Sequence, residues 1–255
     1  MEFNIEEFLN SLPLDTTEID VSGKGLTYLP DLSRFKQLTH LFCSYNELTE
    51  LPPLNDTLKQ LDCFHNFLTE LPHLNDNLEY LDCYNNELTE LPPLNNNLTQ
   101  LFCHHNQLTE LSPLNDNLTI LDCSSNQLTE LPPLNNNLTQ LYCFLNQLTE
   151  LPHLNDKLER LYCFQNQLTW LPPLNNKLQF LDCSDNNIKN INNIIKILRN
   201  FRYTYYCLKF KKHFKMWLWE KVREPKIMAK FHPSHLNALE ETDDLEVFLE
   251  DWINK

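Results

Sequence analysis

The sequence predicts an α/β-type solenoid, a right-handed coil whose turns build one curved parallel β-sheet. A unit of 20 residues, L-x-x-L-x-C-x-x-N-x-L-T-x-L-P-x-L-N-x-x, recurs in register from Leu38 to Leu178. Each copy contains L-x-C, in which alternation points leucine and cysteine inward and the intervening residues outward. One such strand cannot bury its face alone, whereas stacked strands share a continuous core.

Residues 1–18 are expected to cap the first turn, with "FNIEEFLNSL" as a short amphipathic helix. The repeats are expected to span residues 19–192, as a first unit of 22 residues followed by about eight units of 20. In the first unit Lys24 stands where later units have asparagine. Irregular ends suit a solenoid, because a bare terminal coil would expose its core.

The remainder of each unit, "LTELPPLNNN" in several copies, predicts the convex side. Leu48, Leu51 and Leu54 point inward, and proline removes backbone donors that a helix would need. We therefore expect extended or polyproline-like segments there. An asparagine at the turn after each strand predicts a structural ladder of buried amides that satisfy neighbouring backbone groups. The ladder comprises Asn46, Asn66, Asn86, Asn106, Asn126, Asn146, Asn166 and Asn186.

The unit matches the leucine-rich-repeat pattern L-x-x-L-x-L-x-x-[NC]-x-L. It resembles the short repeats of bacterial secreted effectors, "LxxLxVxxNxLTxLPxLPxx", with cysteine replacing valine and PLN replacing PLP. The resemblance covers residues 19–190. It implies that the repeats bind proteins, with any enzymatic activity in a separate domain. The ubiquitin-ligase domain of such effectors is much longer than the tail here and uses a catalytic cysteine. Cys207 lacks that context, so the activity is not carried over.

One cysteine falls in each unit, at intervals of 20 residues. In a stacked sheet these cysteines form a line at the strand spacing of about 4.8 Å, with parallel side chains that neither converge on a metal nor face each other as a disulfide requires. They are expected to be small buried hydrophobes, with oxidation of a pair as the alternative. They are Cys43, Cys63, Cys83, Cys103, Cys123, Cys143, Cys163 and Cys183.

Histidines and glutamates give weaker signals. His104 and His105 adjoin at a strand end, and His232 and His235 could share a face, but no third ligand is evident, so surface positions are favoured over a metal site. A row of glutamates is expected to be a solvated edge, with cation binding as the alternative. The row is Glu50, Glu70, Glu90, Glu110, Glu130 and Glu150.

The outward strand positions carry the variation between units, and they predict a partner-binding surface on the concave face of the solenoid. Exposed aromatic rings on one sheet face are typical of interfaces, and aspartates between them favour a basic partner. The alternative is that the rings only stabilise the sheet by stacking. The candidate residues are Phe42, Phe64, Tyr80, Tyr84, Phe102, Tyr142, Phe144, Tyr162, Phe164, Phe180, Asp62, Asp82, Asp122 and Asp182.

Residues 193–255 are expected to form a helical tail, basic and then acidic. Residues 196–230 hold 11 basic and 2 acidic residues, whereas the whole chain has a formal net charge of -15. The favoured interpretation is a cap over the last coil. Binding of nucleic acid or an anionic surface by residues 196–230, or docking of the tail onto an acidic repeat body, are the alternatives. The run "WLWEKVREPKIM" resembles a C-terminal stretch found on proteins of giant DNA viruses of the mimivirus kind, which implies a viral origin.

The sequence predicts no enzyme, cofactor, metal site or small-molecule substrate. Only 2 glycines occur, and no phosphate-binding loop motif is present. The acidic start does not resemble a signal peptide, and no apolar run is long enough to span a membrane. We expect an intracellular protein-interaction module, in the host cytoplasm or the virion if the chain is viral. An adaptor whose tail binds nucleic acid or an anionic surface, while its repeats recruit a partner, is the alternative.

Overall fold

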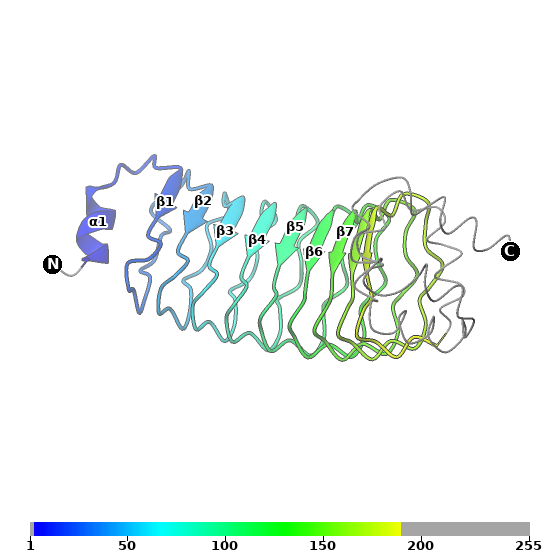
Figure 1. Ribbon diagram of the computed structural model, residues 1–255. Helices are drawn as coiled ribbons and strands as arrows, with labels where there is room; N and C mark the ends of the chain where they lie inside the picture. Colours follow the sequence, from blue (N-terminus) through cyan, green and yellow to red (C-terminus); the bar gives the residue numbers. More distant parts are fainter. Residues whose placement is uncertain (1–2, 190–255) are drawn as a thin grey trace, which may run out of the picture.

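A computed structural model describes residues 3–189 as an elongated coil with strands side by side along one side (Figure 1). The chain begins with helix α1 (Ile5–Ser11). Nine strands follow: β1 (Glu18–Asp20), β2 (His40–Phe42), β3 (Gln60–Asp62), β4 (Tyr80–Asp82), β5 (Gln100–Phe102), β6 (Ile120–Asp122), β7 (Gln140–Tyr142), β8 (Arg160–Tyr162) and β9 (Phe180–Asp182). The expected tail at 193–255 lies outside the described residues.

The strands form one parallel sheet in which each strand pairs with the next along the chain. Leu41 pairs with Leu61 and Leu61 with Leu81, so the register advances by one repeat at every step. Ile19 pairs with Leu41, which confirms the longer first unit. The sequence prediction of a parallel solenoid built from 20-residue turns is therefore correct.

The interior is a column of leucine and cysteine side chains. In a typical coil Leu121, Cys123 and Leu128 are 0 % exposed. Burying a leucine contributes about 1.5–3 kcal/mol, so the repeated core supplies most of the driving force for folding. The segments opposite the sheet contain neither helix nor strand through residue 179, as their prolines predict.

Helix α1 packs at the N-terminal end of this core. Asn4 caps the helix, because its Oδ1 accepts hydrogen bonds from the backbone N–H groups of Glu6 (3.1 Å) and Glu7 (3.2 Å). Ile5 and Leu9 lie on one helical face and are buried. The expected amphipathic helix over residues 3–12 is confirmed.

Candidate protein-interaction surface

The asparagine ladder joins each coil to the one before it. Asn126 Nδ2 donates to the carbonyl oxygens of Cys123 (3.2 Å) and Cys103 (3.0 Å), and Asn126 Oδ1 accepts from the N–H of Leu108 (2.9 Å). Asn46 serves the first coil by accepting from the N–H of Lys24, where a ladder residue is missing. The predicted role of these amides is confirmed, and the ladder is framework rather than binding surface.

A second asparagine ladder, which was not predicted from the sequence, runs along the opposite side of the coil. Asn115 Nδ2 donates to the carbonyl oxygens of Asn95 (2.8 Å) and Leu98 (3.1 Å), while its Oδ1 accepts from the N–H of Asn117 (2.7 Å). The signal was the asparagine that stands where the effector repeats have proline. The ladder includes Asn55, Asn75, Asn95, Asn115, Asn135, Asn155 and Asn175.

The eight cysteines lie inside the coil, and those from Cys43 to Cys163 are free thiols. Each is at most 1 % exposed, so the predicted inward orientation is confirmed. Burial raises the pKa of Cys43 to about 12 and raises the pKa of the other cysteines from Cys63 to Cys163. A neutral buried thiol is a poor nucleophile, so these residues act as core. Within residues 3–189 no cluster of three or more His, Cys, Asp or Glu could hold a metal ion.

The candidate aromatic residues project from the outer face of the sheet, where they stack between neighbouring coils. Phe64 stacks on Tyr84 with ring centroids 4.6 Å apart, and Tyr80 approaches Phe102 at 5.5 Å. These four rings form the first aromatic group. Tyr84 also stacks on His104 at 4.3 Å, which extends that group by one coil.

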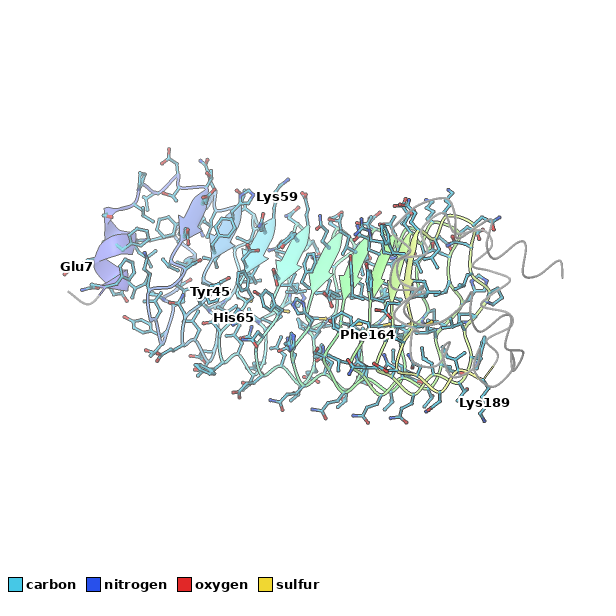
Figure 2. All side chains as sticks on the ribbon, viewed as in Figure 1. Glu7, Tyr45, Lys59, His65, Phe164 and Lys189 are labelled. Carbon is cyan, nitrogen blue, oxygen red and sulfur yellow. The ribbon has the colours of Figure 1, made fainter. Side chains whose placement is uncertain are left out.

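The second aromatic group lies two coils further along. Tyr142 stacks on Tyr162 at 5.0 Å, and Phe144 stacks on Phe164 at 4.4 Å. Phe180 lies beneath the guanidinium of Arg160, whose Cζ is 4.6 Å from the ring centroid. Figure 2 places Phe164 on the coil near the C-terminal end of the described chain. Between the two groups, Asp122 and Ser124 take the positions that rings occupy in the neighbouring coils, and Ser124 is fully buried.

The rings differ from expectation in their exposure. All ten candidate aromatic residues are half-buried rather than exposed, because each ring uses a face to pack on a neighbour or on the sheet. Other large apolar side chains are more exposed, among them Tyr45 (57 %), Phe67 (51 %), Leu145 (41 %) and Trp170 (46 %). Tyr45 and His65 stack at 4.5 Å beside the first aromatic group (Figure 2). They belong to the same surface, although they were not among the residues predicted from the sequence.

The four candidate aspartates are not equivalent. Asp182 is only 1 % exposed and accepts from the N–H (3.1 Å) and hydroxyl (2.6 Å) of Ser184, so it does not present a free surface charge as expected. Asp122 makes the same pair of bonds with Ser124 and lies 3.6 Å from His104 Nδ1. Asp62 and Asp82 follow a different pattern, because an aromatic residue replaces the serine in their coils.

Histidines and glutamates also take definite positions. His104 is half-buried against Tyr84 and not on the open surface, and this burial lowers its pKa although Asp122 opposes the effect. His105 is exposed. The six row glutamates are exposed, as a solvated edge requires, and Trp170 takes the next position in the row. His232 and His235 lie outside the described residues.

Left-handed backbone recurs at the residue before each ladder asparagine. Eight non-glycine residues have φ between 51° and 56°: Tyr45, His65, Asn85, His105, Ser125, Leu145, Gln165 and Asp185. A side chain in this region normally costs about 1–2 kcal/mol, with asparagine tolerated best. The residue type varies at this position of the repeat and is never glycine, so the sequence did not predict the left-handed turn.

These features define the class: a stacked-repeat scaffold with a buried framework and a variable sheet face. The family pattern for leucine-rich repeats (2 copies) matches residues 76–116, and the single leucine-rich repeat matches residues 117–136. The chain is similar to the leucine-rich-repeat domain of a Shigella effector, with 30 % identity and a TM-score of 0.57 over 76 % of this chain and 79 % of that one. The chain belongs to the leucine-rich-repeat family.

Two further solved structures are similar. YopM from Yersinia enterocolitica WA-314 is 36 % identical, with a TM-score of 0.68 over 70 % of this chain. The present chain covers only 40 % of the length of that YopM structure. The functional domain of InlJ from Listeria monocytogenes, which includes a cysteine ladder, shares 32 % identity and a TM-score of 0.53 over 69 % of this chain and 46 % of that one. No curated protein matches the chain.

Leucine-rich-repeat solenoids are in general non-catalytic scaffolds typical of protein–protein interaction modules. The matched neighbours include bacterial effectors, as the resemblance of the repeats implied. Within residues 3–189, no helix is both long enough and apolar enough to cross a membrane.

Proposed function

We propose that this chain is a non-enzymatic interaction module that binds a protein partner on the outer face of its sheet. The observation that carries the proposal is the pair of aromatic groups on that face. Aromatic side chains supply large contact areas at low entropic cost, and rings already stacked on each other lose little further freedom on binding. The stacks also support the sheet, so the rings have a structural role beside the proposed one.

The test compares surface variants against a partner recovered by affinity purification and then purified. Replacing Tyr142, Phe144, Tyr162 and Phe164 with serine is expected to weaken binding at least about tenfold, as loss of interface anchors does. The control replaces Gln107, Gln127, Gln147 and Gln167, which lie outside the aromatic groups, with serine. Undiminished binding by the aromatic variant, with circular dichroism and urea unfolding showing intact repeats, would contradict the proposal.

The second candidate is an adaptor whose basic tail binds nucleic acid or an anionic surface while the repeats recruit a partner. It is supported by the composition of residues 196–230, where basic and aromatic residues alternate. The full chain is then expected to bind nucleic acid at low salt and to release it as salt rises. A chain ending at Lys189 should not bind. Absence of binding by the full chain at low salt would remove this candidate.

The proposal includes a viral origin and action inside a host cell. Both are supported by the resemblance of the tail to a C-terminal stretch of giant-virus proteins. Detection of the protein in infected cells and purified virions by mass spectrometry tests both. Its absence from the host cell interior would contradict the proposed location.

A further inference from the structure

Asp62 and Asp82 lie side by side on the sheet; Asp62 is half-buried, and Asp82 is 8 % exposed. The two residues are paired in register on β3 and β4. Adjacent strands are about 4.8 Å apart, so the carboxyl groups are held close to each other. Lys59 forms an ion pair with Glu79, and His104 lies 3.6 Å from Asp122, but neither contact involves this pair. The sheet therefore holds two neighbouring acids that form no ion pair with a Lys or Arg of residues 3–189, and His40 alone opposes the rise in the pKa of Asp62 through its charge.

Local sequence explains why these two aspartates differ from the others. In the coils of Asp122 and Asp182 a serine two residues later donates a hydroxyl hydrogen bond of 2.6 Å. Phe64 and Tyr84 take that place beside Asp62 and Asp82, and neither ring supplies such a donor. Asp62 and Asp82 therefore lack the strong hydroxyl donor that Asp122 and Asp182 have.

Only long hydrogen bonds reach these two carboxyl groups. Gln60 Nε2 lies 3.3 Å from both oxygens of Asp62. For Asp82, the Tyr80 hydroxyl and the Tyr84 N–H both donate over 3.4 Å. Good bonds to a carboxylate are about 2.7–2.9 Å long, so acceptor capacity remains for a stronger donor.

The surroundings suit a planar cation. The Phe64–Tyr84 stack lies in the column on one side of the aspartate column, and Tyr80 lies in the column on the other. Arginine is favoured where carboxylates and aromatic rings occur together, because it donates in a fork and stacks on ring faces. The same sheet face already holds one guanidinium against a ring, that of Arg160 at 4.6 Å above Phe180.

We propose, on the basis of the proposed protein-binding role, that Asp62 and Asp82 form the cation subsite of the sheet face and receive an arginine side chain of the partner. The guanidinium bridges the two carboxylates and packs against the neighbouring rings. Asp122 and Asp182 take no part in this contact, because the hydroxyl groups of Ser124 and Ser184 already donate to their carboxylates.

Proton binding is coupled to this contact. Burial, followed by the charge of Asp62, raises the pKa of Asp82 to about 7, and burial raises the pKa of Asp62. The other titratable groups that act on the pair are His40 on β2, Tyr80 and Tyr84 at β4, and Asp122 on β6. A bound guanidinium favours the ionised carboxylates, so binding at neutral pH releases protons and strengthens from pH 6 to pH 8.

The test uses the full chain and N-acetyl-arginine amide as the probe, with uncharged N-acetyl-citrulline amide as its shape control. Carboxyl carbon shifts of labelled aspartate are followed by NMR during titration. The expected result is saturable change at Asp62 and Asp82, with affinity about tenfold higher at pH 8 than at pH 6. Equal binding of citrulline, or equal binding of N-acetyl-lysine amide, would overturn the assignment to arginine.

Matched double variants locate the site. Asp62→Asn with Asp82→Asn is expected to abolish saturable binding of the probe. Asp56→Asn with Asp76→Asn removes the same charge from the exposed turns that precede β3 and β4 and should leave binding unchanged. Equal binding by both double variants would overturn the subsite. The result is independent of the serine variants of the aromatic groups, so failure of the subsite and failure of the proposed function can be told apart.

Discussion

The side-chain amide of Asn126 bonds to the carbonyl oxygen of Cys103, 23 residues earlier, at 3.0 Å. The same nitrogen reaches the carbonyl oxygen of Cys123 in its own coil at 3.2 Å. One side chain therefore joins two turns of the solenoid, and its repetition along the chain makes the coils cooperative. Nearest-neighbour contacts of this kind determine the stability of a repeat protein.

Asn126→Ala should destabilise the protein by about 2–4 kcal/mol, because it leaves the buried carbonyl oxygens of Cys103 and Cys123 and the N–H of Leu108 without their partner. Urea unfolding followed by circular dichroism measures the change. Gln127→Ala, at the exposed next position, is the control and should change stability by less than about 0.5 kcal/mol. A loss from Asn126→Ala no larger than that of the control would contradict the ladder's role.

The buried thiols should resist alkylation in the native state. Burial keeps the cysteines from Cys43 to Cys163 neutral and out of contact with reagent, so iodoacetamide should label them at least about a hundredfold more slowly than in denaturing urea. Peptide mass spectrometry measures labelling at each site. Gln127→Cys places a thiol at an exposed position and should react rapidly in the native protein. Native labelling of Cys123 at the rate of that added thiol would refute its place in the core.

The period of the sequence was sufficient to predict the sheet, its register and the inward leucine and cysteine. These follow from alternation along L-x-C, which every copy repeats. The left-handed turn at Leu145 and its equivalents could not be found, because side chains there vary and no glycine marks the conformation. The difference between Asp82 and Asp122 was also missed, since it depends on the residue two positions later and on stacking between coils. Contacts between repeats are invisible to a pattern read within one repeat.

Leu145→Asn should stabilise the protein by about 0.5–1 kcal/mol. Leu145 has φ of 53°, a conformation that asparagine tolerates better than leucine, and Asn85 already occupies the equivalent turn with the same φ. The exposed leucine side chain loses little packing when it is replaced. Thermal unfolding measures the effect. Leu145→Val keeps an apolar side chain but adds β-branching, and it should lower the melting temperature. A stabilising valine would show that backbone strain is not the cause.

Asp82→Asn should stabilise the protein at high pH more than at low pH. The pKa of Asp82 is raised to about 7 in the folded state by burial, and an unfolded aspartate has a pKa of about 3.9. The folded chain therefore binds more protons between these values, and the stability that the protonated acid confers is lost as pH rises through 7.

Asparagine resembles the protonated acid: its Oδ1 can accept from the Tyr84 N–H, and its Nδ2, like the acid O–H, can donate to the Tyr80 hydroxyl oxygen. The variant should exceed the natural protein in stability by about 1–2 kcal/mol at pH 8, and the difference should shrink steadily as the pH falls towards 4. Urea unfolding across this range measures it. Asp56→Asn, at an exposed turn, should show no such trend. A constant difference between Asp82→Asn and the natural protein at every pH would mean that the Asp82 carboxyl does not titrate in the folded state, and it would remove the proton coupling inferred for arginine binding.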